Sequence, residues 1–305
     1  MKNIKTDSSK KSKIAVLLLI LTTVLWGTSF VITKNITQTV PIFFYIGFRF
    51  FLAFLGFLPF FPHLRKLNKE TFLMGLITGL IYFFGFMVQT IGLQSTTAGK
   101  TGFITGLSAI IVPFIACFGF KKPLTRRVWF GVSLSVIGMA FLLLEGESGV
   151  IIGDLIVLIS TVFWAFYIIF NDKFVERVDI YNYSIIQTVI VFLTSFSFSF
   201  IFREQDYSFY NSLDFWIIML YMGIIVMTLT IIFQNWSQKY QGPTQTAIIF
   251  TLEPVFAALF DFIIGGVIFT YFGWIGCSLI FCAILITVIR SNNNISEKEE
   301  VSLNV

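Results

Sequence analysis

The sequence predicts an all-α integral membrane protein in which ten transmembrane helices form two inverted five-helix repeats around a central cavity. Three observations support this fold class. The composition is 56% hydrophobic and only 12% charged, whereas about 25% of the residues in soluble domains are charged. The apolar residues form long runs, and the two halves of the 305-residue chain resemble each other. The lipid bilayer is therefore an expected partner of the chain.

Each predicted span is an apolar run of about 20 residues, the length of α-helix that crosses the hydrocarbon core. The first run, 14–33, follows a polar tail, 1–13, that holds five lysines. Its length is that of a full span rather than of a signal-peptide core. The polar tail 291–305 is predicted to be disordered. In chain order the ten predicted spans are 14–33, 41–61, 71–93, 98–118, 125–144, 150–170, 180–202, 215–236, 244–264 and 271–290.

An internal duplication divides these spans into two repeats, residues 14–144 and 150–290. Identical residues recur at an offset of 138 in the first helix of each repeat and at 145 from the third helix onward. Each repeat holds five spans, an odd number, so the second repeat enters the membrane inverted. Such repeats are typical of transporters with a site near the membrane midplane. The identical pairs are Leu17/Leu155, Thr23/Thr161, Val24/Val162, Trp26/Trp164, Gln89/Gln234, Thr101/Thr246, Leu107/Leu252, Thr125/Thr270, Trp129/Trp274, Gly131/Gly276, Ser133/Ser278 and Leu134/Leu279.

The basic residues predict the orientation of the chain, because lysines and arginines in short loops stay on the cytoplasmic side. Seventeen of the 21 fall on one side if the N-terminus is cytoplasmic, and only Lys34 and Arg203 fall in loops on the other. Both tails are therefore expected in the cytoplasm, and the protein is expected to cross the cell membrane many times. The positive net charge follows from this loop bias, so no nucleic-acid partner is expected.

The ninth span carries an acid followed by a proline, Glu253 and Pro254, near its middle. An ionised carboxylate in hydrocarbon is costly, so such a residue usually faces a partner or a wet cavity. Pro254 cannot donate a hydrogen bond to the carbonyl of Phe250, which predicts a break in the helix. Glu253 is either a site for substrate or proton, or a protonated carboxyl bonded to a neighbouring helix. Thr246 shares its helical face.

Two basic residues also fall within predicted spans. Arg49, near the middle of the second span, keeps its charge and needs an anion or several carbonyls. Its partner could be Glu253 or an anionic substrate group, or it could brace neighbouring helices. Lys100 lies within a turn of the outer end of the fourth span, where it either contacts substrate or a gate, or extends to the interface.

Two pairs of residues at equivalent positions of the repeats complete the candidate site. Gln89 and Gln234 either bind polar groups of a substrate or link helices. Trp26 and Trp164 either line the cavity or pack in the core. The candidate substrate-binding residues are thus Glu253, Arg49, Gln89, Gln234, Trp26, Trp164, Thr246 and Lys100.

The sequence holds little that would support catalysis or a cofactor. It has one histidine, His63, and three cysteines without metal-like spacing, so no metal site is expected. No phosphate-binding glycine loop is present, so ATP is not expected to drive transport directly. We expect no enzymatic activity and no cofactor.

Several segments resemble the EamA family of the drug/metabolite transporter superfamily. They are LWGTSF at 25–30, FRFFLA at 48–53, TTAGKTGFITGLSAIIVPF at 96–114, LEPVFAALF at 252–260 and TYFGWIGCSLI at 270–280. The resemblance covers residues 14 to 290, and its specificity lies in the combination of these segments with the duplication. It implies a ten-helix carrier with a central cavity that often exports amino acids or other small metabolites. The chain has Gly265-Gly266 where family members often have Gly-Glu, so no role of that acid is carried over.

Two functional hypotheses follow. The first is a secondary transporter that exports a small metabolite, such as an amino acid, a related compound or a drug-like molecule, by alternating access. Glu253 would then serve as a proton-linked or substrate-amine group, which makes proton coupling possible. The second is a polytopic membrane protein that does not transport, such as an intramembrane enzyme or a sensor or assembly subunit. The duplication favours the first.

Overall fold

The computed structural model describes residues 2–119, 124–143, 151–204, 212–265 and 270–288, and these residues form helices and turns without a strand. The predicted tail 291–305 lies outside the described residues. In chain order, the first half contains α1 (Lys2–Ile36), α2 (Ile42–Gly56), η1 (Leu58–Lys66), α3 (Lys69–Ser95), α4 (Ala98–Gly106), α5 (Ser108–Phe114), η2 (Ile115–Gly119) and α6 (Arg126–Leu143). The second half contains α7 (Ile152–Val175), α8 (Ile180–Ile201), α9 (Leu213–Leu220), η4 (Tyr221–Thr228), α10 (Leu229–Gln238), α11 (Pro243–Phe250), α12 (Leu252–Gly265) and α13 (Tyr271–Val288).

Among the described residues, seven helical segments are long and apolar enough to cross a membrane, and a bent pair makes up to eight. The helical fold and its membrane-spanning character are therefore as predicted, and the number ten stays a prediction. Helices α6 and α13 occupy the predicted spans 125–144 and 271–290, but they are not among these seven segments.

The second predicted span, 41–61, is not one straight helix. Helix α2 ends at Gly56, and the following 3-10 helix η1 is bent by 73° relative to it. Pro59 and Pro62 lie in η1, and neither can donate the backbone hydrogen bond that would continue α2. The chain therefore turns where the sequence pattern predicted a continuous span.

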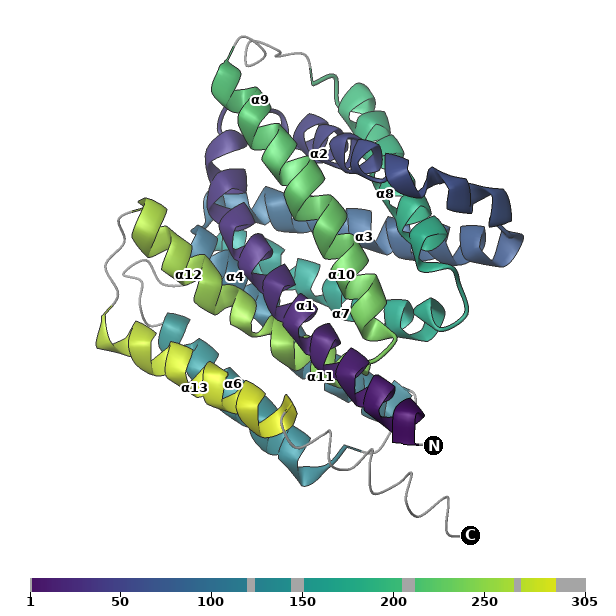
Figure 1. Cartoon of the computed structure of the whole chain (residues 1–305). Helices are drawn as coiled ribbons and strands as arrows, with labels where there is room; N and C mark the ends of the chain where they lie inside the picture. Colours follow the sequence, from purple (N-terminus) through teal and green to yellow (C-terminus); the bar gives the residue numbers. More distant parts are fainter. Residues whose placement is uncertain (1, 120–123, 144–150, 205–211, 266–269, 289–305) are drawn as a thin grey trace.

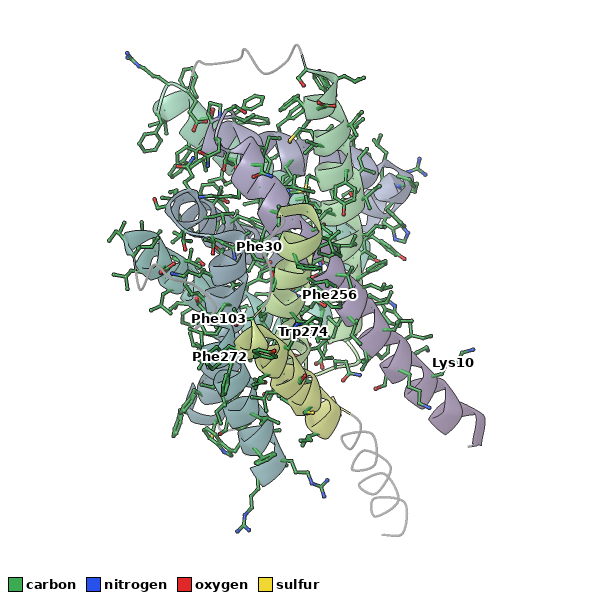
Figure 2. The ribbon with its side chains drawn as sticks, turned by 90° about the vertical axis from the view of Figure 1, so that its left-hand side faces the viewer. Lys10, Phe30, Phe103, Phe256, Phe272 and Trp274 are labelled. Atoms are coloured by element: carbon green, nitrogen blue, oxygen red, sulfur yellow. The ribbon has the colours of Figure 1, made fainter. Side chains whose placement is uncertain are left out.

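The surface is apolar as well as the core. Phe200 is 85% exposed and Phe118 is 73% exposed. On α13, Phe272 and Trp274 also lie on the outside, at 47% and 62% exposure (Figure 2). Large exposed apolar surfaces of this kind are expected where a protein contacts lipid or another protein rather than water.

The helices pack in pairs that recur between the two halves. Helix α1 packs along α10 and α12, and α7 correspondingly packs along α3, α4 and α5. Helix α2 packs along η4, and α8 packs along α3. Helices α6 and α13 lie side by side along one edge of the molecule (Figure 1). At the centre α1 and α12 approach so closely at Gly27 that a Cβ added there would lie only 2.6 Å from the Cβ of Phe256.

Two spans are broken at equivalent points. In the span Ala98–Gly119 the helix is interrupted at Leu107, between α4 and α5. In the span Pro243–Ile264 it is interrupted at Thr251, between α11 and α12. Leu107 plus the repeat offset of 145 gives position 252, next to Thr251. Pro254 falls in the first turn of α12, where its missing N–H does not disturb the helix that follows.

Candidate functional site

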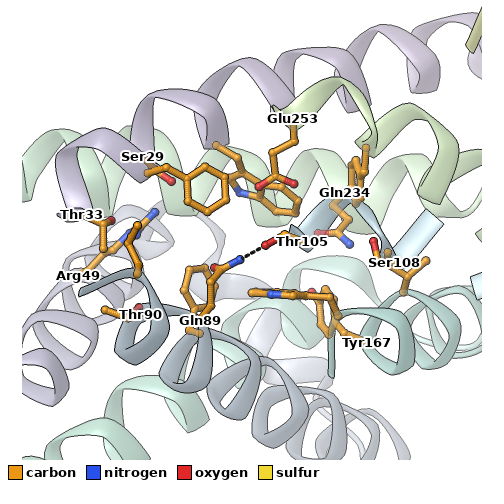
Figure 3. A pocket seen from close by; sticks show the side chains of 17 residues that line it. Ser29, Thr33, Arg49, Gln89, Thr90, Thr105, Ser108, Tyr167, Gln234 and Glu253 are labelled. Carbon is orange, nitrogen blue, oxygen red and sulfur yellow. Dashed lines mark hydrogen bonds between the residues drawn. The ribbon is translucent and has the colours of Figure 1, made fainter. Parts of the chain in front are cut away.

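A cavity lies between the central helices. The space not filled by atoms, including the open mouth of the cavity, is about 620 Å³. Figure 3 shows its polar side chains pointing toward one another from both halves of the chain. The lining residues are Trp26, Ser29, Phe30, Thr33, Arg49, Phe86, Gln89, Thr90, Leu93, Thr105, Ser108, Trp164, Tyr167, Ile168, Gln234, Phe250 and Glu253.

Glu253 lies in the first turn of α12, directly after the break at Thr251. Its carboxyl points into the cavity (Figure 3), yet the residue is only 5% exposed. The described residues give this carboxyl no hydrogen-bond partner, which makes its ionised form expensive. The N-terminal end of α12 contributes a favourable potential for negative charge. The position therefore suits a carboxyl that binds a cation or a proton.

Arg49 reaches the same cavity from α2 and is 2% exposed. Its Nη1 donates a hydrogen bond to the hydroxyl of Tyr45 at 3.2 Å, and that hydroxyl is 2.7 Å from the hydroxyl of Thr33. The ring of Phe86 lies 5.4 Å from the guanidinium carbon. Within the described residues, Nε and Nη2 have no hydrogen-bond partner, and no ion pair joins Arg49 to Glu253. Arg49 and Glu253 are thus not paired with each other, and each has polar side-chain atoms without a hydrogen-bond partner among the described residues.

The two glutamines line the cavity with different partners. Gln89 donates from Nε2 to the hydroxyl of Thr105 at 2.8 Å (Figure 3). Gln234 donates to Oε1 of Gln238 at 3.4 Å, and its own Oε1 has no partner among the described residues. The difference arises because Phe250 stands at the position equivalent to Thr105, so Gln234 lacks the hydroxyl that Gln89 uses.

The two tryptophans meet at the centre, with ring centroids 6.4 Å apart. Trp26 also packs against Phe250 at 5.0 Å, and Trp164 against Phe86 at 5.0 Å. Both indole nitrogens are buried without a hydrogen-bond partner in the described part of the chain. The two tryptophans therefore provide two indole N–H groups that have no acceptor among the described residues.

Six of the eight candidate residues predicted from the sequence thus line one cavity, and Thr246 and Lys100 do not. Thr246 is fully buried in α11. Lys100 lies 3.7 Å from the carboxylate of Asp154, with both side chains at most 10% exposed. The carboxylate of Asp154 also accepts hydrogen bonds from the hydroxyl of Thr96 and from the backbone N–H of Ile151.

Sequence reasoning missed Asp154, although it is an acid inside the predicted span 150–170. It also missed the cavity hydroxyls of Ser29, Thr33 and Thr90. The signal for Ser29 and Thr33 was present, because they follow Trp26 at helical spacings of three and seven and so share its face. No group of three or more histidine, cysteine, aspartate or glutamate side chains in the described residues is placed to hold a metal ion.

Comparison with known proteins agrees with this architecture. The model of the EamA-like transporter family matches the chain twice, over residues 13–144 and 151–289. An uncharacterized transporter of Archaeoglobus fulgidus is 30% identical over 272 residues, which cover 89% of this chain and 85% of that protein. The uncharacterized transporter YoaV of Bacillus subtilis is 23% identical over 79% of this chain and 85% of its own.

A solved structure described as "Crystal structure of protein" shares the fold. Its TM-score is 0.71 at 15% sequence identity, with 90% of this chain and 96% of that chain covered. The duplicated match to the family model spans nearly the whole sequence. The chain is therefore a multi-pass membrane protein that belongs to the EamA-like transporter family.

Proposed function

We propose that this protein is a secondary transporter that exports a small metabolite by alternating access between two inverted repeats. The substrate would be an amino acid, a related compound or a drug-like molecule. The direction of transport rests on the family resemblance. The described loops between spans are short, and the cavity at the centre is where such a carrier would bind its substrate.

The composition of the cavity carries this proposal. Twelve of its seventeen lining residues form six pairs when positions are related by the two repeat offsets, 138 and 145. A cavity built from equivalent positions of both halves is expected if it lies on a pseudo-twofold axis between inverted repeats. The six pairs are Trp26/Trp164, Ser29/Tyr167, Phe30/Ile168, Gln89/Gln234, Thr105/Phe250 and Ser108/Glu253.

The packing of whole helices supports the same symmetry. The contact of α1 with α10 corresponds to that of α7 with α3, and the contact of α2 with η4 corresponds to that of α8 with α3. Two contacts, α2 with α8 and α6 with α13, join equivalent helices to each other, and the contact of α4 with α12 joins the two broken spans. We therefore keep ten spans, with repeats at 14–144 and 150–290, as part of the proposal.

The proposed orientation follows from the loop charges. With both termini in the cytoplasm of a cell-membrane protein, the C-terminal ends of α7 and α10 lie on the cytoplasmic side. The C-terminal ends of α1 and α3 then lie outside. Lys239, after α10, is on the cytoplasmic side, where burial lowers the pKa of its amine while nearby Asp179 opposes this effect.

The site residues suggest a substrate with polar ends and an apolar body. Glu253 would hold an amine or exchange a proton, and the free guanidinium nitrogens of Arg49 would meet an acidic group. Gln89 and Gln234 would bind neutral polar groups, and Trp26 and Trp164 would pack on the body of the substrate. Thr246 and Lys100 lie behind the lining in this conformation, so they would contact substrate only after the helices move.

Transport in vesicles tests the proposal. Purified protein in liposomes should exchange labelled amino acids or related metabolites across the membrane faster than protein-free liposomes. A competition series of zwitterions, amines and carboxylates would identify the class. If no compound in these classes moves above the protein-free control with correctly folded protein, the transporter assignment fails and the non-transporting alternative gains support.

A further inference from the structure

One side of the cavity is closed by a buried network of neutral side chains. Gln187 on α8 donates hydrogen bonds to Thr78 on α3 at 2.9 Å and to Asn171 on α7 at 3.3 Å. The side-chain amide of Asn235 on α10 donates to Oε1 of Gln187 at 2.9 Å. We call Gln187, Asn171, Asn235 and Gln238 the amide cluster, and all are at most 2% exposed.

The amide cluster joins α7 to α10, two helices that both contribute lining residues to the cavity. Asn171, near the C-terminal end of α7, donates to Gln238 at the C-terminal end of α10. Gln238 also accepts from Gln234, which lines the cavity. The cluster therefore lies between the cavity and the proposed cytoplasmic side, and it links α7 to α10 across that side.

The repeat offsets relate the amide cluster to the opposite end of the cavity. The equivalents of Asn171, Gln187, Asn235 and Gln238 are Thr33, Arg49, Thr90 and Leu93. All four equivalents line the cavity, and none of the amide cluster does. Among the described lining residues, these four and Phe86 are the ones whose repeat partners do not also line the cavity. The cavity thus extends to the end where these equivalents lie and stops short of the amide cluster.

Packing supports the equivalence of Arg49 and Gln187. Gln187 contacts Thr78, and the repeat equivalent of Thr78 is Gly223. A Cβ added at Gly223 would lie 2.8 Å from the backbone oxygen of Arg49, so the two contacts correspond. Tyr45 and Tyr183, one turn before each residue, are identical at the same offset of 138.

We propose that Arg49 belongs to an outer gate, in which it takes the part that Gln187 plays in the closed amide cluster. This inference rests on the proposed carrier function. When the cavity closes to the outside, the guanidinium donates to the hydroxyls of Thr33 and Thr90, the equivalents of the Gln187 partners Asn171 and Asn235. In the present conformation, Nε and Nη2 of Arg49 have no hydrogen-bond partner among the described residues, so both are available to form these bonds. The gates alternate, so one network forms as the other breaks.

Thiol labelling in the absence of substrate tests this gate. The reporter is Ser29→Cys in the full chain with its three cysteines replaced by alanine, since Ser29 lines the cavity. A membrane-impermeant maleimide is added to either side of oriented vesicles, and the ratio of outside to inside labelling rates is measured. Arg49→Ala should raise this ratio roughly three- to tenfold, and Gln187→Ala should lower it by a similar factor. Arg49→Gln should restore most of the wild-type ratio.

The matched control is Thr188→Ala on α8, because the hydroxyl of Thr188 bonds only to the carbonyl of Ser184 in its own helix. It should leave the ratio unchanged. If Arg49→Ala leaves the ratio unchanged, or shifts it in the same direction as Gln187→Ala, the outer gate is refuted. A role limited to substrate contact predicts no shift without substrate, and a general loss of folding lowers labelling on both sides. If the parent protein labels from one side only and transports nothing, the carrier function itself has failed.

Discussion

At the scale of residues, the two repeats contribute different side chains to the cavity, although most of the lining positions are paired. Ser108 stands where the other repeat has Glu253, and Thr105 stands where it has Phe250. The single acid therefore belongs to one repeat, and Arg49 approaches from the other. The cavity thus holds one carboxyl and one guanidinium, which under the proposed function would bind a cationic and an anionic group of the substrate.

Glu253→Gln tests the role of the acid. The amide keeps the shape of the side chain but cannot exchange a proton or carry charge, so transport should lose its dependence on pH or its affinity for amine substrates. The measurement is transport in liposomes across an imposed pH gradient. Ser108→Ala is the matched control at the equivalent position and should keep the pH response. An unchanged pH response in Glu253→Gln would exclude a proton role for this carboxyl.

The ion pair between Lys100 and Asp154, which lies outside the cavity lining, is expected to stabilise the fold. Asp154→Asn removes the negative partner of a buried ammonium, and breaking a buried pair in this way costs about 3–5 kcal/mol. The melting temperature in detergent should fall by several degrees. Adding Lys100→Met removes the stranded charge and should recover part of the loss. An unchanged melting temperature in Asp154→Asn would show that the pair does not stabilise the fold.

Charge and repetition explain which site residues the sequence could predict. Glu253 and Arg49 were found because charges are rare in apolar spans, and the glutamine and tryptophan pairs because they recur in both repeats. Thr33 carries only its helical spacing from Trp26 as a signal, and Thr90 carries none, because hydroxyl side chains in membrane helices often bond to their own backbone. The repeat offset of 138 relates Arg49 to Gln187, and the contacts of Gly223 and Thr78 in the structure support this equivalence.

At the scale of elements, the helix breaks at Leu107 and Thr251 place helix termini beside the cavity, since Ser108 and Phe250 both line it. Discontinuous helices of this kind form binding sites in other transporters. The sequence predicted the break before Pro254 from its missing N–H. It did not predict the break at Leu107, where no proline removes the corresponding hydrogen bond, nor the bend after α2.

Pro254→Ala tests the break between α11 and α12. Alanine supplies an N–H for the carbonyl of Phe250, so the two helices can join and the position of Glu253 becomes more rigid. The transport rate should fall severalfold while the melting temperature stays equal or rises. Pro113→Ala in α5 is the control, since Pro113 does not line the cavity. Equal transport in Pro254→Ala and the parent protein would show that the break has no part in the cycle.

At the scale of the whole molecule, the predicted helical membrane fold is confirmed, and the duplication explains how one sequence builds both ends of the cavity. The count of ten spans and the orientation stay predictions, because they depend on short helices and on loop charges. The single conformation described is closed by the amide cluster. The central claim is that a second conformation exists in which the opposite end closes.

Cross-linking each end of the cavity in turn tests this claim most directly. Cysteines at Asn171 and Gln238, joined by a short bifunctional thiol reagent, would hold the amide-cluster end closed, and cysteines at Thr33 and Leu93 would hold the other end closed. The account predicts that either cross-link stops transport. The first should leave the Ser29→Cys reporter labelled only from outside, and the second only from inside. Continued transport with the first cross-link in place would contradict alternating access.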